Sequence, residues 1–228
     1  MKKGISVIKR RNQVQGILFT LPAILGFLIF TLLPMAASLY LSFTDYRISN
    51  KPLLIGADNY VRLFSGEDYF FYKALGVTAY YVVLSVPTFL IVAFFIANLL
   101  NSEIKGMAIF RTIFYLPSIV PVVATSMIWA WLFNPDFGLF NSILKSLGLP
   151  QSQWIYNEKT VIPSIVLMGI WTTGSTMVIF LAGLQDVPKQ LYEAAKVDGA
   201  GYWKRMRFIT IPLMTPTLFF NLIMGMIN

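Results

Sequence analysis

The 228-residue chain contains no cysteine and no histidine, and only 12% of its residues are charged. Without thiols it can form no disulfide, and without thiolates or imidazoles it lacks the usual ligands of a zinc site. Hydrophobic residues make up 57% of the chain, and its mean hydropathy is +0.68. A soluble chain of this composition would lack the polar surface needed to stay dispersed. We therefore expect much of the chain to face lipid, and we expect no metal site and no catalytic residue.

Long uncharged segments predict an all-α membrane protein, because a helix needs about 20 apolar residues to cross about 30 Å of hydrocarbon. The predicted spans are listed at the end of this paragraph, and together they form one transmembrane domain over residues 1–228. The first is too long for a signal-peptide core, so we expect it to be retained. The fifth is still apolar where the sequence stops, so we expect it to be incomplete. The spans are roughly 16–42, 74–100, 112–133, 161–185 and 212–228.

The distribution of lysine and arginine predicts the orientation. The N-terminus, the 101–111 turn and the 186–211 loop carry five, two and five of these residues, whereas the 45–73 and 134–160 loops carry four and two. Cytoplasmic loops are enriched in positive charge. The prediction is a multi-pass membrane protein with its N-terminus and its 186–211 loop in the cytoplasm.

Prolines and tryptophans mark special positions in these spans. Each internal proline removes a backbone donor and is expected to bend its helix, either as a fixed kink or as a hinge that moves. These prolines are Pro34, Pro87, Pro117, Pro121 and Pro163. Tryptophans near span ends are expected at the membrane interface; they are Trp129, Trp131, Trp154 and Trp203.

The 186–211 loop, DVPKQLYEAAKVDGAGYWKRMRFITI, predicts two short helices joined by a turn. Asp186 is expected to cap the first helix, with Pro188 in its first turn. Gly199 suits a left-handed residue that ends it, and the second helix is basic and amphipathic. A small-residue face, made of Val187, Leu191, Ala194 and Ala195, would allow a partner to approach closely. The alternative is a basic loop lying on anionic lipid headgroups.

One pattern favours the partner. Glu193-Ala194-Ala195, Gly199 after three more residues, and Ile209-x-Ile211-Pro212 resemble the EAA motif of binding-protein-dependent ABC importer permeases, with Ile211 in place of the usual leucine. In that family the loop is the coupling helix, which docks on a cytoplasmic ATPase subunit. The resemblance implies that Glu193 is the polar anchor of this contact and Gly199 its turn. The residues it assigns to the contact are Glu193, Ala194, Ala195, Asp198 and Gly199.

Further stretches are similar to the carbohydrate branch of this family, the maltose and glycerol-3-phosphate class. They include LPAILGFLIFTLLPMAASLYLSFTDY, GADNYVRLF and RTIFYLPSIVPVVATSMIWAWLFNPDFGLFN. The resemblance implies a type I ABC importer permease of the bacterial cell membrane, paired with a second, non-identical permease. An extracytoplasmic solute-binding protein would deliver the solute to the 45–73 and 134–160 loops. Such permeases usually have six spans, so we expect this chain to be truncated.

Two absences bear on the energy source. The sequence has no G-x-x-x-x-G-K-[ST] phosphate-binding loop, so ATP and magnesium are expected on a partner ATPase and no cofactor on this chain. The predicted spans contain no charged residue, whereas proton-coupled carriers place titratable groups within the membrane. The chain is therefore expected to be a transport subunit and not an enzyme. Two alternatives stay open: an ABC permease for an amino acid, phosphate or metal, and an ATP-independent carrier that binds sodium at broken helices.

The solute pathway is less well marked. Hydroxyl and amide side chains beside aromatic rings would suit a sugar, although serine and threonine also mediate helix packing in membranes. The candidate residues are Asn98, Thr125, Ser126, Thr172, Thr173, Ser175 and Thr176.

Overall fold

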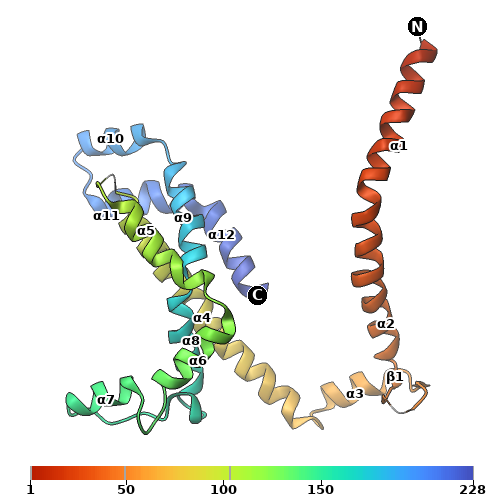
Figure 1. Ribbon diagram of the computed structural model, residues 1–228, viewed down its shortest axis with the longest axis horizontal. Coiled ribbons are helices and arrows are strands. Elements are labelled where there is room, and N and C mark those ends of the chain that lie inside the picture. Colours follow the sequence, from red (N-terminus) through yellow and green to blue (C-terminus); the bar gives the residue numbers. More distant parts are fainter. Residues whose placement is uncertain (1, 49, 103, 228) are drawn as a thin grey trace. The chain divides into compact units, whose positions relative to one another are not determined.

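The computed structural model describes residues 2–48, 50–102 and 104–227, and the chain divides into two compact units (Figure 1). Unit 1 is Met1–Ala74 and unit 2 is Leu75–Asn228. Almost all regular structure is helical; the described residues contain only two strands, each of two residues. The predicted all-α architecture is therefore confirmed.

Unit 1 begins with a long run of helix. It comprises α1 (Lys2–Phe27), a π-helical segment η1 (Leu28–Leu32) and α2 (Leu33–Leu41). Two strands follow, β1 (Thr44–Asp45) and β2 (Leu53–Leu54), which pair antiparallel with Thr44 opposite Leu54. Helix α3 (Asp58–Ser65) then leads into α4 (Tyr69–Leu100), whose first residues belong to this unit.

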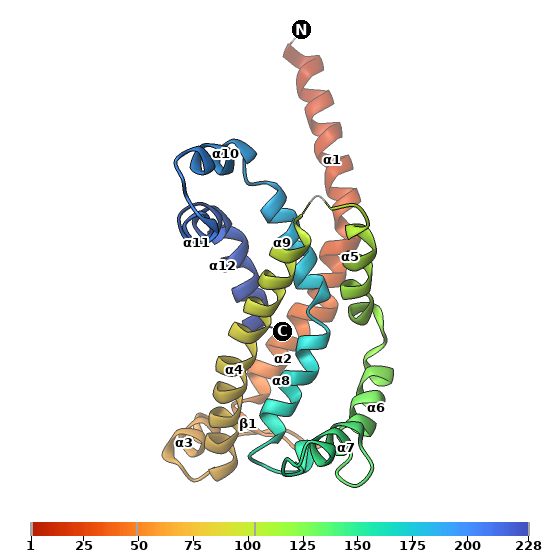
Figure 2. The ribbon, with the colours of Figure 1, turned by 90° about the vertical axis from the view of Figure 1, so that its left-hand side faces the viewer.

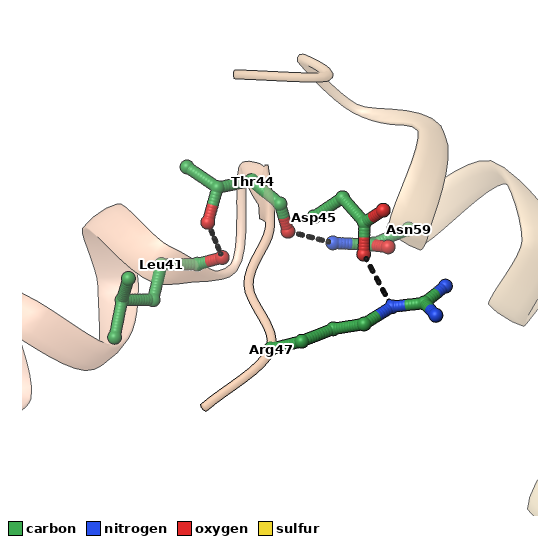
Figure 3. A network of polar contacts seen from close by, with 5 residues as sticks. All are labelled: Leu41, Thr44, Asp45, Arg47 and Asn59. Atoms are coloured by element: carbon green, nitrogen blue, oxygen red, sulfur yellow. Dashed lines mark hydrogen bonds and ion pairs between the residues drawn. The ribbon is translucent and has the colours of Figure 1, made fainter. Parts of the chain in front are cut away.

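Asn59 fastens the end of the first helical run. Its amide donates to the Ser42 carbonyl at 2.9 Å and to the Thr44 carbonyl at 3.0 Å. Figure 3 shows the second of these bonds, together with the 2.8 Å bond that the Thr44 hydroxyl donates to the Leu41 carbonyl. An exposed ion pair between Arg47 and Asp45 lies beside this network at 3.5 Å. The asparagine within the GADNY stretch thus pairs the carbonyl of Ser42, the residue that ends α2, and the carbonyl of Thr44 in β1.

Unit 2 contains the rest of α4 and eleven further helical segments. In chain order they are α5 (Met107–Tyr115), η2 (Leu116–Ile119), α6 (Val122–Leu132), α7 (Leu139–Ser146), η3 (Trp154–Tyr156), α8 (Val161–Trp171), α9 (Gly174–Gln185), α10 (Lys189–Val197), α11 (Tyr202–Arg205), η4 (Met206–Thr210) and α12 (Ile211–Ile227). Within this unit, α10 lies at the same end as the α4–α5 connection, and α7 lies at the opposite end (Figures 1 and 2). We call residues 98–102, 104–107 and 184–210 the α10 end, and residues 129–160 the α7 end.

The core of unit 2 lies where α4, α9 and α12 meet. Ala93 and Ala97 of α4 are fully buried, and their small side chains allow α9 to pack closely. Phe180 of α9 is also fully buried and packs edge-to-face on Phe94, with ring centroids 5.6 Å apart. The remaining core residues are Leu100, Met177, Leu181, Leu184, Val187 and Met214.

Three helical segments are long and apolar enough to cross a membrane: Gln13–Leu41, Tyr69–Leu100 and Tyr202–Ile227. Two bent pairs raise the number to five if each counts as one span: Met107–Ile119 with Val122–Leu132, and Val161–Trp171 with Gly174–Gln185. Each of the five lies over one predicted span. The last helix differs from the prediction because it begins at Tyr202, so the predicted second short helix runs without interruption into the fifth span.

The two helix breaks have different origins. The first pair bends by 94° at Val120-Pro121, where Pro121 precedes α6 with an extended ψ of 135°. The second bends by 54° at Thr172-Thr173, with no proline at the break. Pro163, where a bend was expected, instead lies in the first turn of α8, where a missing N–H costs nothing.

Both π-helical segments end two residues before a proline, η1 before Pro34 and η4 before Pro212. Proline cannot donate to the carbonyl four residues earlier, and its ring crowds that carbonyl. A π turn widens the helix and shifts the bonding to the residue five back. The Leu33 and Ile211 N–H groups accordingly donate to the carbonyls of Leu28 and Met206.

Candidate functional site

Helix α10 is the predicted coupling helix, and its ends are built by local rules. Pro188, not Asp186, occupies the N-cap position, and no side chain caps the helix there. Asp186 instead ends α9, so the predicted cap is wrong. The reason is that α9 continues to Gln185, which leaves only Val187 between Asp186 and the cap residue.

The predicted glycine turn is confirmed. Gly199 has a φ of +73°, and its N–H donates to the Lys196 carbonyl at 3.1 Å. The Ala200 N–H donates to the Ala195 carbonyl at 2.8 Å. This pair of bonds is the Schellman arrangement, which satisfies the last carbonyls of a helix through one left-handed residue.

The faces of α10 differ from the predicted small-residue stripe. Tyr192 and Ala195 are half-buried and face the bundle, whereas Glu193, Ala194 and Val197 are exposed. Val197, which the sequence pattern did not single out, is 88% exposed. The two alanines of the motif therefore point in different directions, because consecutive helical residues lie about 100° apart.

A polar cavity of about 300 Å³ lies behind α10. Asn101, Ser102 and Arg111 line it from the α4–α5 region, and Gln185, Lys189 and Tyr192 line it from the α9–α10 region. The Arg111 guanidinium donates to the Leu100 carbonyl at 2.9 and 3.3 Å, which ties α5 to the end of α4. The 101–111 turn and the 186–211 loop thus share one end of unit 2.

A larger cavity of about 650 Å³ lies between α4, α9 and α12. Of the predicted pathway residues, only Ser175 and Thr176 line it. The structure adds four polar residues that the sequence reasoning missed: Thr78, Tyr81, Ser85 and Asn221. Phe89 and Phe220 supply aromatic rings, so the lining combines hydroxyls, an amide and rings.

A sequence signal for two of the missed residues existed. Ser85 and Asn221 are isolated polar residues within apolar runs, and both are buried, at 2% and 5% exposure. The Asn221 amide donates to the Thr217 carbonyl at 2.8 Å, which leaves its carbonyl oxygen as an acceptor at the cavity. Pattern alone could not have shown that three separate helices bring these side chains together.

Thr172 and Thr173 lie at the break between α8 and α9 and do not line the large cavity. Their hydroxyls donate to the carbonyls of Gly169 and Ile170 at 3.0 and 2.8 Å. These carbonyls near the end of α8 also accept the backbone N–H groups of Thr172 and Thr173, at 3.1 and 3.3 Å, so the two hydroxyls reinforce the end of the helix. Gly174 lets α9 approach α5 at this point, since a Cβ there would lie 2.9 Å from Tyr115 Cα.

The remaining pathway candidates lie elsewhere. Asn98 is at the α10 end, where its amide donates to the Tyr202 hydroxyl. Thr125 is 8% exposed, and its hydroxyl has no hydrogen-bond partner within the described ranges. Ser126 is exposed, and its hydroxyl donates to the Val122 carbonyl at 2.8 Å. These three residues and the large cavity do not form one site.

Asn141 organises the α7 end. It is 2% exposed, and its amide donates to the carbonyls of Pro135 and Ser152, both at 2.9 Å. Its side-chain oxygen accepts the Ser152 N–H at 3.1 Å and the Trp154 indole N–H at 2.9 Å. An asparagine side chain offers two donor hydrogens and two acceptor lone pairs, so this residue uses its full capacity.

Aromatic rings complete the α7 end. Trp154 stacks on Phe133 with centroids 5.0 Å apart, and Trp129 stacks on Phe140 at 5.9 Å. Trp154 has a φ of +46°, which is rare for a bulky residue. The tryptophans were expected at the membrane interface, but Trp129 is 8% exposed and half-buried Trp154 packs against the same rings. Shared packing thus places both within one cluster.

Titratable residues are sparse throughout. Among residues 2–48, 50–102 and 104–227 there is no group of three or more acidic, histidine or cysteine residues arranged to hold a metal ion. The chemistry that the described arrangement offers is therefore hydrogen bonding, ring stacking and the presentation of exposed helix faces.

Comparison with known proteins agrees with this architecture. Residues 90–228 match the family model described as the binding-protein-dependent transport system inner membrane component. The whole chain is 44% identical to the probable ABC transporter permease protein YesP of Bacillus subtilis and covers 73% of that protein. It is 33% identical, over 98% of its length, to the trehalose/maltose transport system permease protein MalF of Thermococcus litoralis, of which it covers 76%.

A solved structure is also similar. A bacterial alginate ABC transporter, in complex with an alginate pentasaccharide-bound periplasmic protein, contains a chain that matches with a TM-score of 0.80 and 28% identity. The match covers 96% of the present chain and 73% of that one. The fold of the chain therefore has a counterpart in a transport complex.

Proposed function

The chain belongs to the family of binding-protein-dependent transport system inner membrane components, and from this premise we propose that it is the permease subunit of an ATP-driven importer for a sugar, an oligosaccharide or a polyol-like solute. The names of two relatives support the solute class, since one concerns trehalose and maltose and the other alginate. The observation that carries the proposal is the exposed helix α10, which presents the EAA motif at one end of a multi-pass bundle.

We place the docking surface for a cytoplasmic ATPase on the outer side of α10. Glu193, Ala194 and Val197 are exposed there, and the small Ala194 side chain leaves room for a groove on the partner. Asp198 and Gly199 end the helix and set the direction of the chain. Ala195 contributes through its backbone, because its half-buried side chain faces the bundle and its carbonyl accepts the Ala200 N–H.

Co-purification tests this contact. An affinity-tagged chain co-expressed with its ATPase should retain that subunit, and Glu193→Lys should lower the retained fraction by about tenfold, because a charge is reversed in the contact. Glu67→Lys, the same change at an exposed residue of unit 1, is the matched control and should retain the ATPase. Equal retention by the two variants would remove α10 from the contact.

The orientation follows from the same proposal, with the N-terminus and the α10 end in the cytoplasm and the α7 end outside. The absence of native cysteine allows single-cysteine labelling. Val197→Cys, at an 88% exposed position, should react with a membrane-impermeant maleimide only in inverted vesicles, prepared without the ATPase so that this surface is uncovered. Leu147→Cys, at a 67% exposed position next to α7, should react in right-side-out cells. The opposite pattern would overturn the proposal.

The solute is proposed to pass through the cavity between α4, α9 and α12. Thr176→Val removes a lining hydroxyl at nearly constant volume, and the Michaelis constant for sugar uptake should rise about five- to tenfold, as one lost hydrogen bond implies. Ser126→Ala removes an exposed hydroxyl that bonds only within α6, and its uptake should be unchanged. If Thr176→Val left uptake unaltered, the cavity would not be the pathway.

The alternatives have their own signatures. An ATP-independent carrier would still accumulate solute in cells from which the partner ATPase has been deleted, whereas the proposed importer would not. An importer for amino acids, phosphate or metals would be inhibited by an excess of those solutes and not by sugars. Uptake of a radiolabelled solute under each condition separates the three functions.

A further inference from the structure

A hydrogen bond ties the coupling helix to the base of the last helix. The hydroxyl of Tyr192, on α10, and the hydroxyl of Thr210, on η4, lie 2.9 Å apart. Thr210 is 3% exposed and Tyr192 is half-buried, so the bond is largely shielded from water. Shielded bonds of this kind are stronger than exposed ones, and an unpaired partner is costly. The contact is therefore suited to holding two elements together while they move.

Thr210 is also part of a π-helical segment. Its hydroxyl lies 3.4 Å from the carbonyl of Arg205, five residues earlier, and the next N–H, that of Ile211, donates to Met206. Pro212 follows at once and donates nothing. The π turn is thus the point in the Tyr202–Ile227 helix where the regular ladder is already interrupted, and a change in register or direction costs least there.

The surroundings of this bond are loosely packed. A cavity of about 140 Å³ is lined by both hydroxyl residues together with Asn98, Tyr202, Arg205 and Met206. The Nε of Arg205 is buried with no hydrogen-bond partner among the residues that the structure describes. A spare donor beside a small cavity allows the polar groups to exchange partners when α10 shifts, which close packing would prevent.

The last helix connects the Tyr192–Thr210 contact, which we call the joint, to the proposed solute pathway. Phe220 and Asn221 of α12 line the large cavity, and Met214, between them and the joint, is 1% exposed in the core. A displacement at the η4 segment would therefore be carried along a packed helix to the residues that contact solute.

We propose that the Tyr192–Thr210 hydrogen bond and the π turn beneath it transmit the movement of the coupling helix to α12, so that Tyr192 and Thr210 are positioning residues for coupling. The proposal rests on the proposed function, because it requires an ATPase that moves α10. It adds that docking of the ATPase and transmission of its work are separable: exposed residues of α10 dock, and a residue on its opposite face transmits.

The test uses the complete transporter, with its ATPase, partner permease and binding protein, in proteoliposomes. Tyr192→Phe and Thr210→Val each remove one hydroxyl at nearly constant shape. Both should retain the ATPase on co-purification and should still hydrolyse ATP, while solute moved per ATP hydrolysed falls about fivefold to tenfold. Thr210→Ser keeps the hydroxyl and should restore most of the ratio. Thr215→Val, at an exposed threonine one turn further along, is the matched control and should leave the ratio unchanged.

The double variant sharpens the result. Since both substitutions break the same bond, Tyr192→Phe with Thr210→Val should be no worse than either alone. Normal transport per ATP in both single variants, or additive losses in the double variant, would overturn the proposal that the joint transmits movement. Loss of the ATPase from the single variants would overturn the separation of docking from transmission. A wild-type chain that retained no ATPase would instead refute the proposed function itself.

Discussion

The two ends of unit 2 are held together in opposite ways. At the α7 end, Asn141 makes four hydrogen bonds at 2.9 to 3.1 Å, and the rings of Trp129, Phe133, Phe140 and Trp154 stack around it. At the α10 end, cavities of about 300 and 140 Å³ remain, and the Nε of Arg205 is unpaired within the described residues. The α7 end is thus held by a fully bonded amide and by stacked rings, although the Trp129 indole N–H has no partner among the described residues, and the α10 end keeps spare volume.

This difference matches what each end is proposed to do. A surface that receives a binding protein gains affinity when it is rigid before contact, because no ordering cost is then paid on binding. A joint that moves in each transport cycle needs two arrangements of similar free energy, and a close-packed interior does not provide them. Polar residues in one membrane protein can therefore hold one region rigid and leave another region able to change its contacts.

The largest predicted effect comes from removing the hydrogen bonds of Asn141 at the α7 end. Asn141→Leu leaves the Ser152 N–H and the Trp154 indole N–H buried without partners, so the free energy of unfolding should fall by about 3–5 kcal/mol. Thermal unfolding in detergent micelles measures this loss, and trypsin cleavage at Lys145 should accelerate. Asn157→Leu removes an exposed acceptor for the Lys159 N–H and is the control with a small effect. Equal melting temperatures for the two variants would contradict the proposal that Asn141 makes the α7 end rigid.

Adding a methyl group at Gly138 and at Gly199 compares the packing of the two ends. Gly138, at the α7 end, is buried, and an added Cβ would lie 2.6 Å from the Leu132 carbonyl oxygen and 2.8 Å from the Asn134 nitrogen. Because backbone atoms cannot move aside cheaply, Gly138→Ala should destabilise unit 2 by about 2–3 kcal/mol in the same unfolding measurement. An effect below that of Gly199→Ala would show that the α7 end yields more readily than its contacts imply.

Gly199→Ala probes the α10 end. A Cβ at Gly199 would meet no atom within 4 Å, so only the φ of +73° opposes the substitution. The left-handed conformation costs a non-glycine residue about 1–2 kcal/mol, and the unfolding free energy should fall by about that amount. Transport per ATP should fall with it, since the turn sets the direction of α10. A fully stable variant would mean that the loop readily adopts another turn.

Trp203 should give the smallest effect. This residue of the α10 end is 80% exposed, and its ring lies 5.4 Å from that of neighbouring Tyr202. Trp203→Ala should change the free energy of unfolding by less than about 0.5 kcal/mol. Trp154→Ala, which removes a ring from the α7 cluster, should cost several times more, about 3–5 kcal/mol. Similar losses of unfolding free energy in the two variants would show that the two ends do not differ in packing.

Several features could be predicted from local sequence. The five apolar segments follow from composition and length, and the turn at Gly199 follows from the glycine preference for positive φ. The EAA motif correctly indicated a helix and a turn at 188–200 and pointed to the family. The cap at Asp186 was wrong because Asp186 still ends α9, and α10 begins only at Lys189, after Pro188 at its N-cap.

The sequence did not indicate which of the candidate pathway residues lie together. Ser175 and Thr176 line the large cavity, but Asn98 lies at the α10 end and Thr173 fastens a helix break. Serine and threonine look alike in sequence whether they face a cavity, a neighbouring helix or their own backbone carbonyls. Only the set of helices that meet at a given depth distinguishes these roles, and hydropathy does not contain that information.

The sequence by itself determined that this chain is a multi-span helical membrane protein, which apolar segments form its long helices, and which loop carries the EAA motif. Those features depend on segment length, charge and backbone preference, each of which is local. The tertiary structure alone decided that Asn141 saturates one end, that Tyr192 meets Thr210 at the other, and that Ser85, Thr176 and Asn221 share a cavity. These contacts join residues from different elements, and their geometry is set by how the helices pack, which no single segment specifies.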